Sequence, residues 1–200
     1  VGPSGAVARE FEWTLLSSVM AANATGQQQE QPLFGGAMSV LLPPGWLDAS
    51  DIRPVPDHQE VWTEMGGANR SIVIELLERV EGSDAEIAGT HFEELARASD
   101  AAESTIIRCE RLSSIPGGSW HGVPALLVQG LQMLRGGQTE LRLSLAIIPL
   151  AAQKTDVLVC INRDEVEASV DGESARTTDM QLLLALLSSL SVNDWTLFGS

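Results

Sequence analysis

The segment over residues 71–80 most constrains what this chain can fold into. Its apolar residues occupy both odd and even positions, with Ile72 and Ile74 on one side of an extended strand and Val73 and Leu77 on the other. Successive side chains of a strand point to opposite faces of its sheet. A strand that is apolar on both sides therefore predicts a sheet that is covered on both faces.

Six further segments have the apolar composition of strands, and several are separated by short turns. They cover residues 37–42, 60–62, 104–112, 123–134, 139–150 and 156–162. Pro43-Pro44-Gly45 ends the first of them, and Gly136-Gly137 forms a hairpin turn between two others. Because strands joined by short turns run in opposite directions, we expect an antiparallel sheet.

Two segments predict helices, and each opens with a capping pattern. Ser83 is followed three residues later by Glu86, and Thr178 by Gln181. Apolar residues then recur at helical spacing, at Ala85, Ala88, Phe92, Leu95 and Ala96 in the first helix and at Met180, Leu183, Leu184, Leu187 and Leu190 in the second. The sequence thus predicts a single α+β domain over residues 32–200, an antiparallel β-sheet flanked by helices on both faces.

Residues 1–31 differ from this domain in composition. They are rich in small residues and glutamine, with a short helical pattern over residues 10–22. We interpret them as a flexible N-terminal extension or an added segment. No apolar run approaches the length of a bilayer span, so we expect no direct membrane insertion.

Acidic residues dominate the charge of the chain, whose formal net charge is −15. Residues 48–103 hold fourteen acidic residues and only four arginines. Such a surface repels nucleic acid and anionic membranes and attracts basic protein surfaces. The alternative is that the acidity serves only to keep the protein in solution.

The sequence offers little support for an enzyme, a cofactor or a metal site. None of its glycine pairs belongs to a phosphate-binding loop, and Lys154 is the only lysine. Ser119 lies close to His121 but lacks the spacing of a nucleophile elbow, and the three histidines are scattered. Cys109 and Cys160 lie in strand-like runs, which predicts two reduced core thiols.

The densest group of charged residues lies over residues 47–61. Pro54 and Pro56 hold this backbone extended, and Asp57 and Glu60 follow at a turn into a strand. Three interpretations stay open from the residues alone. The carboxylates could belong to a solvated turn, could perform acid/base catalysis as in glycosidases, or could dock a stiff acidic loop onto basic residues of a partner.

These residues resemble the Ran guanine nucleotide release factors. The matching blocks are Leu33-Phe34-Gly35-Gly36-Ala37, Pro43-Pro44-Gly45-Trp46-Leu47-Asp48-Ala49-Ser50 and Arg53-Pro54-Val55-Pro56-Asp57-His58-Gln59-Glu60-Val61. Weaker agreement occurs over residues 71–78, 91–95, 155–158 and 194–199. The resemblance implies a sheet with helices on both faces, binding to the GTPase Ran, release of its nucleotide, and support of nuclear protein import.

The resemblance also implies where Ran binds. In that family the acidic pair matching Asp57 and Glu60 is associated with Ran contact, and the same signature includes Asp48 and Arg53. The expected Ran-binding set is Asp57, Glu60, Asp48, Arg53, Asp51 and Ser50. We expect a monomeric, non-catalytic GTPase regulator of the nucleus and cytoplasm, without a cofactor. The alternatives are an adaptor of the same fold for another transport or membrane protein, and a hydrolase using Asp57 with Glu60 or Ser119 with His121.

Overall fold

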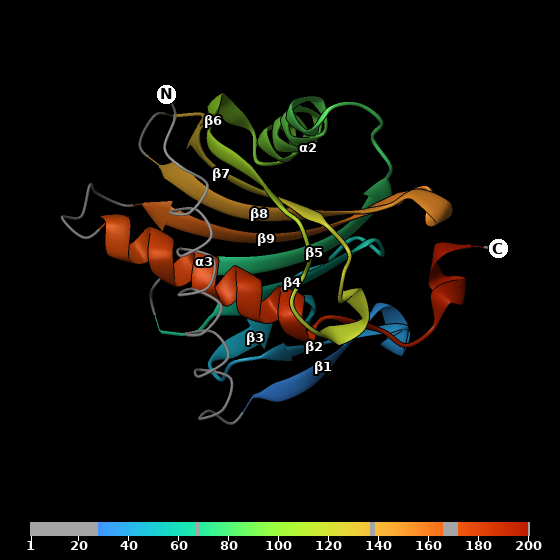
Figure 1. The fold of residues 1–200 in the computed structure, drawn as a ribbon. Coiled ribbons are helices and arrows are strands. Elements are labelled where there is room, and N and C mark those ends of the chain that lie inside the picture. Colours follow the sequence, from blue (N-terminus) through green and yellow to red (C-terminus); the bar gives the residue numbers. More distant parts are fainter. Residues whose placement is uncertain (1–27, 67–68, 137–138, 166–171, 200) are drawn as a thin grey trace.

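The computed structural model describes residues 28–66, 69–136, 139–165 and 172–199 of the 200-residue chain (Figure 1). The helical pattern over residues 10–22 lies outside these residues, as does Gly137 of the expected hairpin turn. The described residues form two antiparallel sheets together with two long helices.

The larger sheet has seven strands in the order β3-β4-β5-β9-β8-β7-β6, and every neighbouring pair is antiparallel. Its strands are β3 (Trp46–Asp48), β4 (Gln59–Glu64), β5 (Arg70–Glu78), β6 (Ala101–Leu112), β7 (Ala125–Leu134), β8 (Glu140–Leu150) and β9 (Thr155–Glu165). The smaller sheet consists of β1 (Gln29–Leu33), β2 (Met38–Leu42) and β10 (Ser191–Val192), with β2 in the middle. The expected antiparallel strands are confirmed.

The prediction that β5 makes apolar contacts on both faces is confirmed, although the face toward helix α2 (Asp84–Ala98) is only partly covered. Ile72 and Ile74 are fully buried in a core shared with helix α3 (Gly172–Ser189) and the smaller sheet. Val73 and Leu77, on the opposite face, pack against the core beneath α2. In Figure 1, α2 and α3 lie on either side of the larger sheet.

The smaller sheet was not predicted. The segment around β2 was assigned to one sheet with the other strands, but β2 pairs instead with β1 and β10. β1 begins at Gln29, so residues 29–31 belong to a strand rather than to the expected extension. Because β1 is largely polar and β10 has two residues, neither carries a detectable pattern.

Helix α2 begins as predicted but buries a slightly different face. Ser83 and Glu86 form the capping box through reciprocal hydrogen bonds. Ala88, Phe92 and Ala96 are buried, whereas Ala85 is exposed and Ile87 packs in its place. Gly130 of β7 permits this packing, because a Cβ atom there would clash with the ring of Phe92.

His91 completes the buried side of α2. Its Nε2 lies 2.8 Å from the Oδ2 atom of Asp156 on β9, and both side chains are fully buried. The same Asp156 oxygen accepts the backbone N–H of Val80 at 2.9 Å. His91 is thus a packed side chain of the core, with a carboxylate partner that lies 65 residues away in the chain.

Helix α3 begins at Gly172, six residues before the predicted cap at Thr178. Its Asp179 is 1% exposed and accepts hydrogen bonds from Arg163 of β9 and Arg70 of β5. Arg70 also pairs with Glu64 and lies 5.5 Å above the ring of Trp46. This cluster, formed by Glu64, Arg70, Arg163 and Asp179, fastens α3 to the sheet.

The two cysteines occupy different environments, so the prediction of two core thiols is wrong for one of them. Cys160 is buried on β9, and burial raises the pKa of its thiol well above the usual range. Cys109 is exposed because β6 is the edge strand of the larger sheet, with water on most of its length. An edge strand and a central strand can have similar apolar composition, which explains the error.

Candidate functional site: an acidic loop at the end of the sheet

The loop that carries the predicted site connects β3 to β4. It begins with a short 3-10 helix, η2 (Ala49–Asp51), whose first turn is capped by Asp48 through a 2.8 Å hydrogen bond from the Ser50 N–H. It ends in a turn closed by a 2.9 Å bond from the Gln59 N–H to the Pro56 carbonyl. We call residues 48–60 the acidic loop.

Most of the predicted residues lie on the surface of the acidic loop. Ser50, Asp51, Arg53 and Asp57 are all exposed. In the part of the chain that the structure describes, no ion pair involves the charged side chains of Asp51, Arg53 or Asp57. Their charges are therefore free to meet those of another molecule.

Glu60 is held more firmly than the exposed members of the loop. Its side chain is half-buried and accepts a hydrogen bond from the backbone N–H of Phe34. Burial raises the pKa of the Glu60 carboxyl, the Phe34 hydrogen bond opposes this rise, and the nearby charge of Asp48 adds to it. The structure thus brings Asp48 and Glu60 together, with a backbone N–H rather than an arginine as the partner of Glu60.

The backbone that binds Glu60 adopts an unusual conformation. Phe34 has a φ of 49°, and Gly35 and Gly36 follow with φ values of 67° and 91°. A bulky residue in the left-handed region is strained, and the Glu60 hydrogen bond helps to hold it there. The C-terminal segment supports the same turn, because the side-chain amide of Asn193 donates to the Gly36 carbonyl at 3.2 Å.

Not all predicted residues share one surface. The side chains of Asp48 and Glu60 lie near each other, whereas Arg53 lines a cleft beside α2. Asp57 lies in the turn before β4, between Arg53 and Glu60 in the chain. Sequence reasoning missed the part played by Phe34, although the adjacent Gly35-Gly36 pair signals a turn with positive φ values.

Ser119 and His121, one of the two pairs considered for hydrolysis, are not joined in the structure. The Ser119 hydroxyl accepts a 3.3 Å hydrogen bond from the backbone N–H of Val192. Among the described residues, no hydrogen bond joins Ser119 to His121, and no group of three or more His, Cys, Asp or Glu side chains is suited to hold a metal ion. None of the helices described here is long and apolar enough to cross a membrane.

Comparison with known proteins confirms the family resemblance that the sequence indicated. A family model described as Ran-interacting Mog1 protein matches residues 31–164. The Ran guanine nucleotide release factor of Bos taurus is 32% identical over 86% of this chain and 97% of its own length. The nuclear import protein mog1 of Schizosaccharomyces pombe is 30% identical over 79% of this chain and 90% of its own length.

A solved structure shows the same fold. The crystal structure of the Saccharomyces cerevisiae Ran-binding protein Mog1p aligns with a TM-score of 0.69 and 26% sequence identity. The alignment covers 88% of this chain and all of that one. The two sheets and two helices therefore correspond to an architecture already seen in a Ran-binding protein.

Proposed function

This chain belongs to the Ran-interacting Mog1 family, and from that premise we propose that it binds the GTPase Ran through its acidic loop. We further propose that binding promotes release of the guanine nucleotide and so supports nuclear protein import. The names of the relatives, Ran guanine nucleotide release factor and nuclear import protein, support this role. Such a role requires the protein in the nucleus and the cytoplasm.

One observation carries the proposal: the acidic loop has carboxylates that the described part of the protein does not neutralise. Asp57 is exposed without an ion pair, and Glu60 is half-buried against a backbone N–H. Basic residues of a partner would gain charge-assisted hydrogen bonds from each of them. Because Glu60 is already fixed and partly dehydrated, the cost of ordering it on binding is small.

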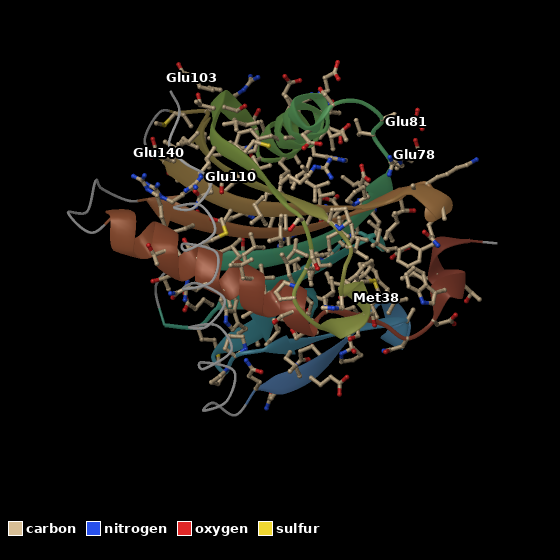
Figure 2. All side chains as sticks on the ribbon, in the orientation of Figure 1. Met38, Glu78, Glu81, Glu103, Glu110 and Glu140 are labelled. Atoms are coloured by element: carbon tan, nitrogen blue, oxygen red, sulfur yellow. The ribbon has the colours of Figure 1, made fainter. Side chains whose placement is uncertain are left out.

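The mechanism needs no covalent step. If this protein binds nucleotide-free Ran more tightly than the loaded form, reciprocity requires that it weaken nucleotide binding to Ran by the same factor. The formal charge of −15 would speed the encounter with a basic surface. Exposed acidic side chains around α2, among them Glu78, Glu81 and Glu103, add to this negative surface (Figure 2).

Release of a fluorescent nucleotide from purified Ran tests the proposal. Wild-type protein should accelerate release, and Asp57→Ala and Glu60→Ala should reduce the acceleration. Glu93→Ala is the matched control, because Glu93 is an exposed glutamate of α2 whose side chain is 71% accessible. Equal acceleration by all four proteins would remove the acidic loop from the mechanism, and no acceleration by wild type would refute nucleotide release.

A further inference from the structure

A cleft of about 740 Å³ lies between the acidic loop and helix α2. Its floor is the face of β4 and β5 that carries Val61 and Val73, which are paired across the two strands. Ala49, Ile52 and Arg53 line it from the side of the acidic loop, and the second half of α2 forms the opposite wall. Neither the proposed loop contact nor the family comparison accounts for this cleft.

The cleft exists because α2 covers only part of its face of the sheet. The helix lies closest to β6 and β7 and its buried side also contacts β8 and β9, whereas β4 and β5 lie toward the other end of the strand order. The floor is consequently open, with an apolar centre at Val61 and the half-buried Val73 and with polar side chains around it. Ile52, on the rim, is 64% exposed and is among the most exposed large apolar residues that the structure describes.

Glu75 gives the cleft its charge. The side chain of Glu75 is 9% exposed, and its Oε1 accepts from the Gln59 amide at 2.7 Å and lies 3.3 Å from the His58 Nε2. No lysine or arginine in the described ranges pairs with Glu75. Glu94 adds a second carboxylate on the wall of α2, so the cleft holds two carboxylates and the single guanidinium of Arg53.

We propose that this cleft receives a segment of Ran in which an apolar side chain lies beside a lysine or arginine. This inference rests on the proposed function and adds to it a second contact. The apolar side chain would cover Val61, Val73 and Ile52, and the cationic group would reach Glu75. A nearly buried carboxylate that no described lysine or arginine neutralises is complementary to such a group, because a charge-assisted hydrogen bond is strong where water is largely excluded.

The acidic loop joins the proposed Ran contact at Asp57 to the proposed contact in the cleft. Ile52 and Arg53 border the cleft, and Asp57 follows four residues after Arg53 in the same loop. A single partner bound at Asp57 is therefore placed to reach the cleft as well. In this contact the exposed Ile52 would pack against the apolar side chain of the partner. Apolar anchors beside a concave site are typical of the centre of an interface.

Affinity for nucleotide-free Ran, measured by calorimetry, tests the cleft with two variants. Glu75→Gln removes the charge but keeps an oxygen that can accept from Gln59, and Ala98→Trp places a large side chain at the exposed lip on α2. We expect each to weaken binding about tenfold or more. Glu93→Gln, an equal loss of charge on α2 away from the cleft lining, should bind as wild type does.

A photocrosslinking residue tests the contact without relying on affinity. Placed at Thr63, which lines the cleft, it should crosslink to a Ran peptide that contains lysine or arginine. Placed at the exposed Thr105 of β6, it should not. Thermal unfolding of each variant verifies that the fold is retained.

The outcomes separate the cleft from the proposed function. If both cleft variants bind Ran normally and Thr63 gives no crosslink, while Asp57→Ala weakens binding, the cleft proposal is overturned and the loop contact stands. If wild-type protein does not bind Ran, the proposed function and the cleft proposal fall together. Weakened binding by Glu75→Gln with a crosslink at Thr63 supports the cleft.

Discussion

Asp179 and Asp57 carry the same side chain but lie in opposite surroundings, one buried and one exposed. Asp179 is 1% exposed and accepts from Arg163 at 2.7 Å and from Arg70 at 3.3 Å. Asp57 is exposed on the acidic loop and pairs with no other described residue. A carboxylate that its own protein neutralises contributes to the fold, whereas one left unpaired at the surface is available to a partner.

Replacing Asp179 should have the largest effect on stability. Asp179→Ala leaves Arg163 and Arg70 without their shared acceptor in a largely buried setting. We expect the free energy of unfolding to fall by about 3–5 kcal/mol, measured by urea denaturation. Ran affinity per folded molecule should change little. A loss of stability no larger than that of a surface substitution would break the contrast with Asp57.

Reversing the charge of Asp57 should have the opposite profile. Asp57→Lys places a like charge against the proposed basic face of Ran, so we expect affinity to fall about thirtyfold, or about 2 kcal/mol. The free energy of unfolding should stay within about 0.5 kcal/mol of wild type, because an exposed residue without partners contributes little to stability. Parallel calorimetry and denaturation measure both quantities, and a destabilised variant with normal affinity would contradict this assignment.

Ionic strength should affect the acidic loop and the Asp179 cluster differently. Raising the ionic strength from about 0.05 to 0.5 M shortens the Debye length several-fold, so the association rate with Ran should fall about tenfold. The Asp179 cluster is largely shielded from solvent, so the loss of stability caused by Asp179→Ala should change much less with salt. Stopped-flow binding tests the first expectation. An association rate that is independent of salt would show that the negative surface does not steer Ran.

The smallest expected effect is a difference in pH dependence between Glu60 and Glu64. Burial raises the pKa of the Glu60 carboxyl above 4.5, so its contribution to stability is present at low pH and is lost as the pH rises through the folded-state pKa. The hydrogen bond from Arg70 lowers the pKa of Glu64, so its contribution is present above pH 4.5 and is lost as the pH falls.

Denaturation between pH 3 and pH 7 measures this difference. Relative to Glu60→Gln, wild type should lose stability as the pH rises above 4.5. Relative to Glu64→Gln, wild type should lose stability as the pH falls below 4.5. Slopes of the same sign for both variants would contradict the assigned environments.

Local patterns in the sequence predicted much of the fold. The two-sided apolar pattern of residues 71–80 identified a strand with apolar contacts on both faces, and Ser83 with Glu86 located the start of α2. Both signals depend on neighbouring residues only. The smaller sheet was missed because β10 lies more than 140 residues after β2 and has two residues, so no local pattern reports their pairing.

The candidate site was predictable in composition but not in contacts. Sequence similarity singled out Asp57 and Glu60, and the proline residues explained a stiff loop. The Glu60 hydrogen bond to Phe34 spans 26 residues, and the bond between Arg70 and Asp179 spans 109. Only the folded chain shows that Glu60 is half-buried, that Arg53 borders a cleft, and that Glu75 lies in it.

The affinity of Asp57→Ala for nucleotide-free Ran tests the central claim most directly. If a free carboxylate of the acidic loop is the point at which Ran is held, the dissociation constant should rise about tenfold while the unfolding curve stays unchanged. An unchanged dissociation constant in a correctly folded variant would contradict the account.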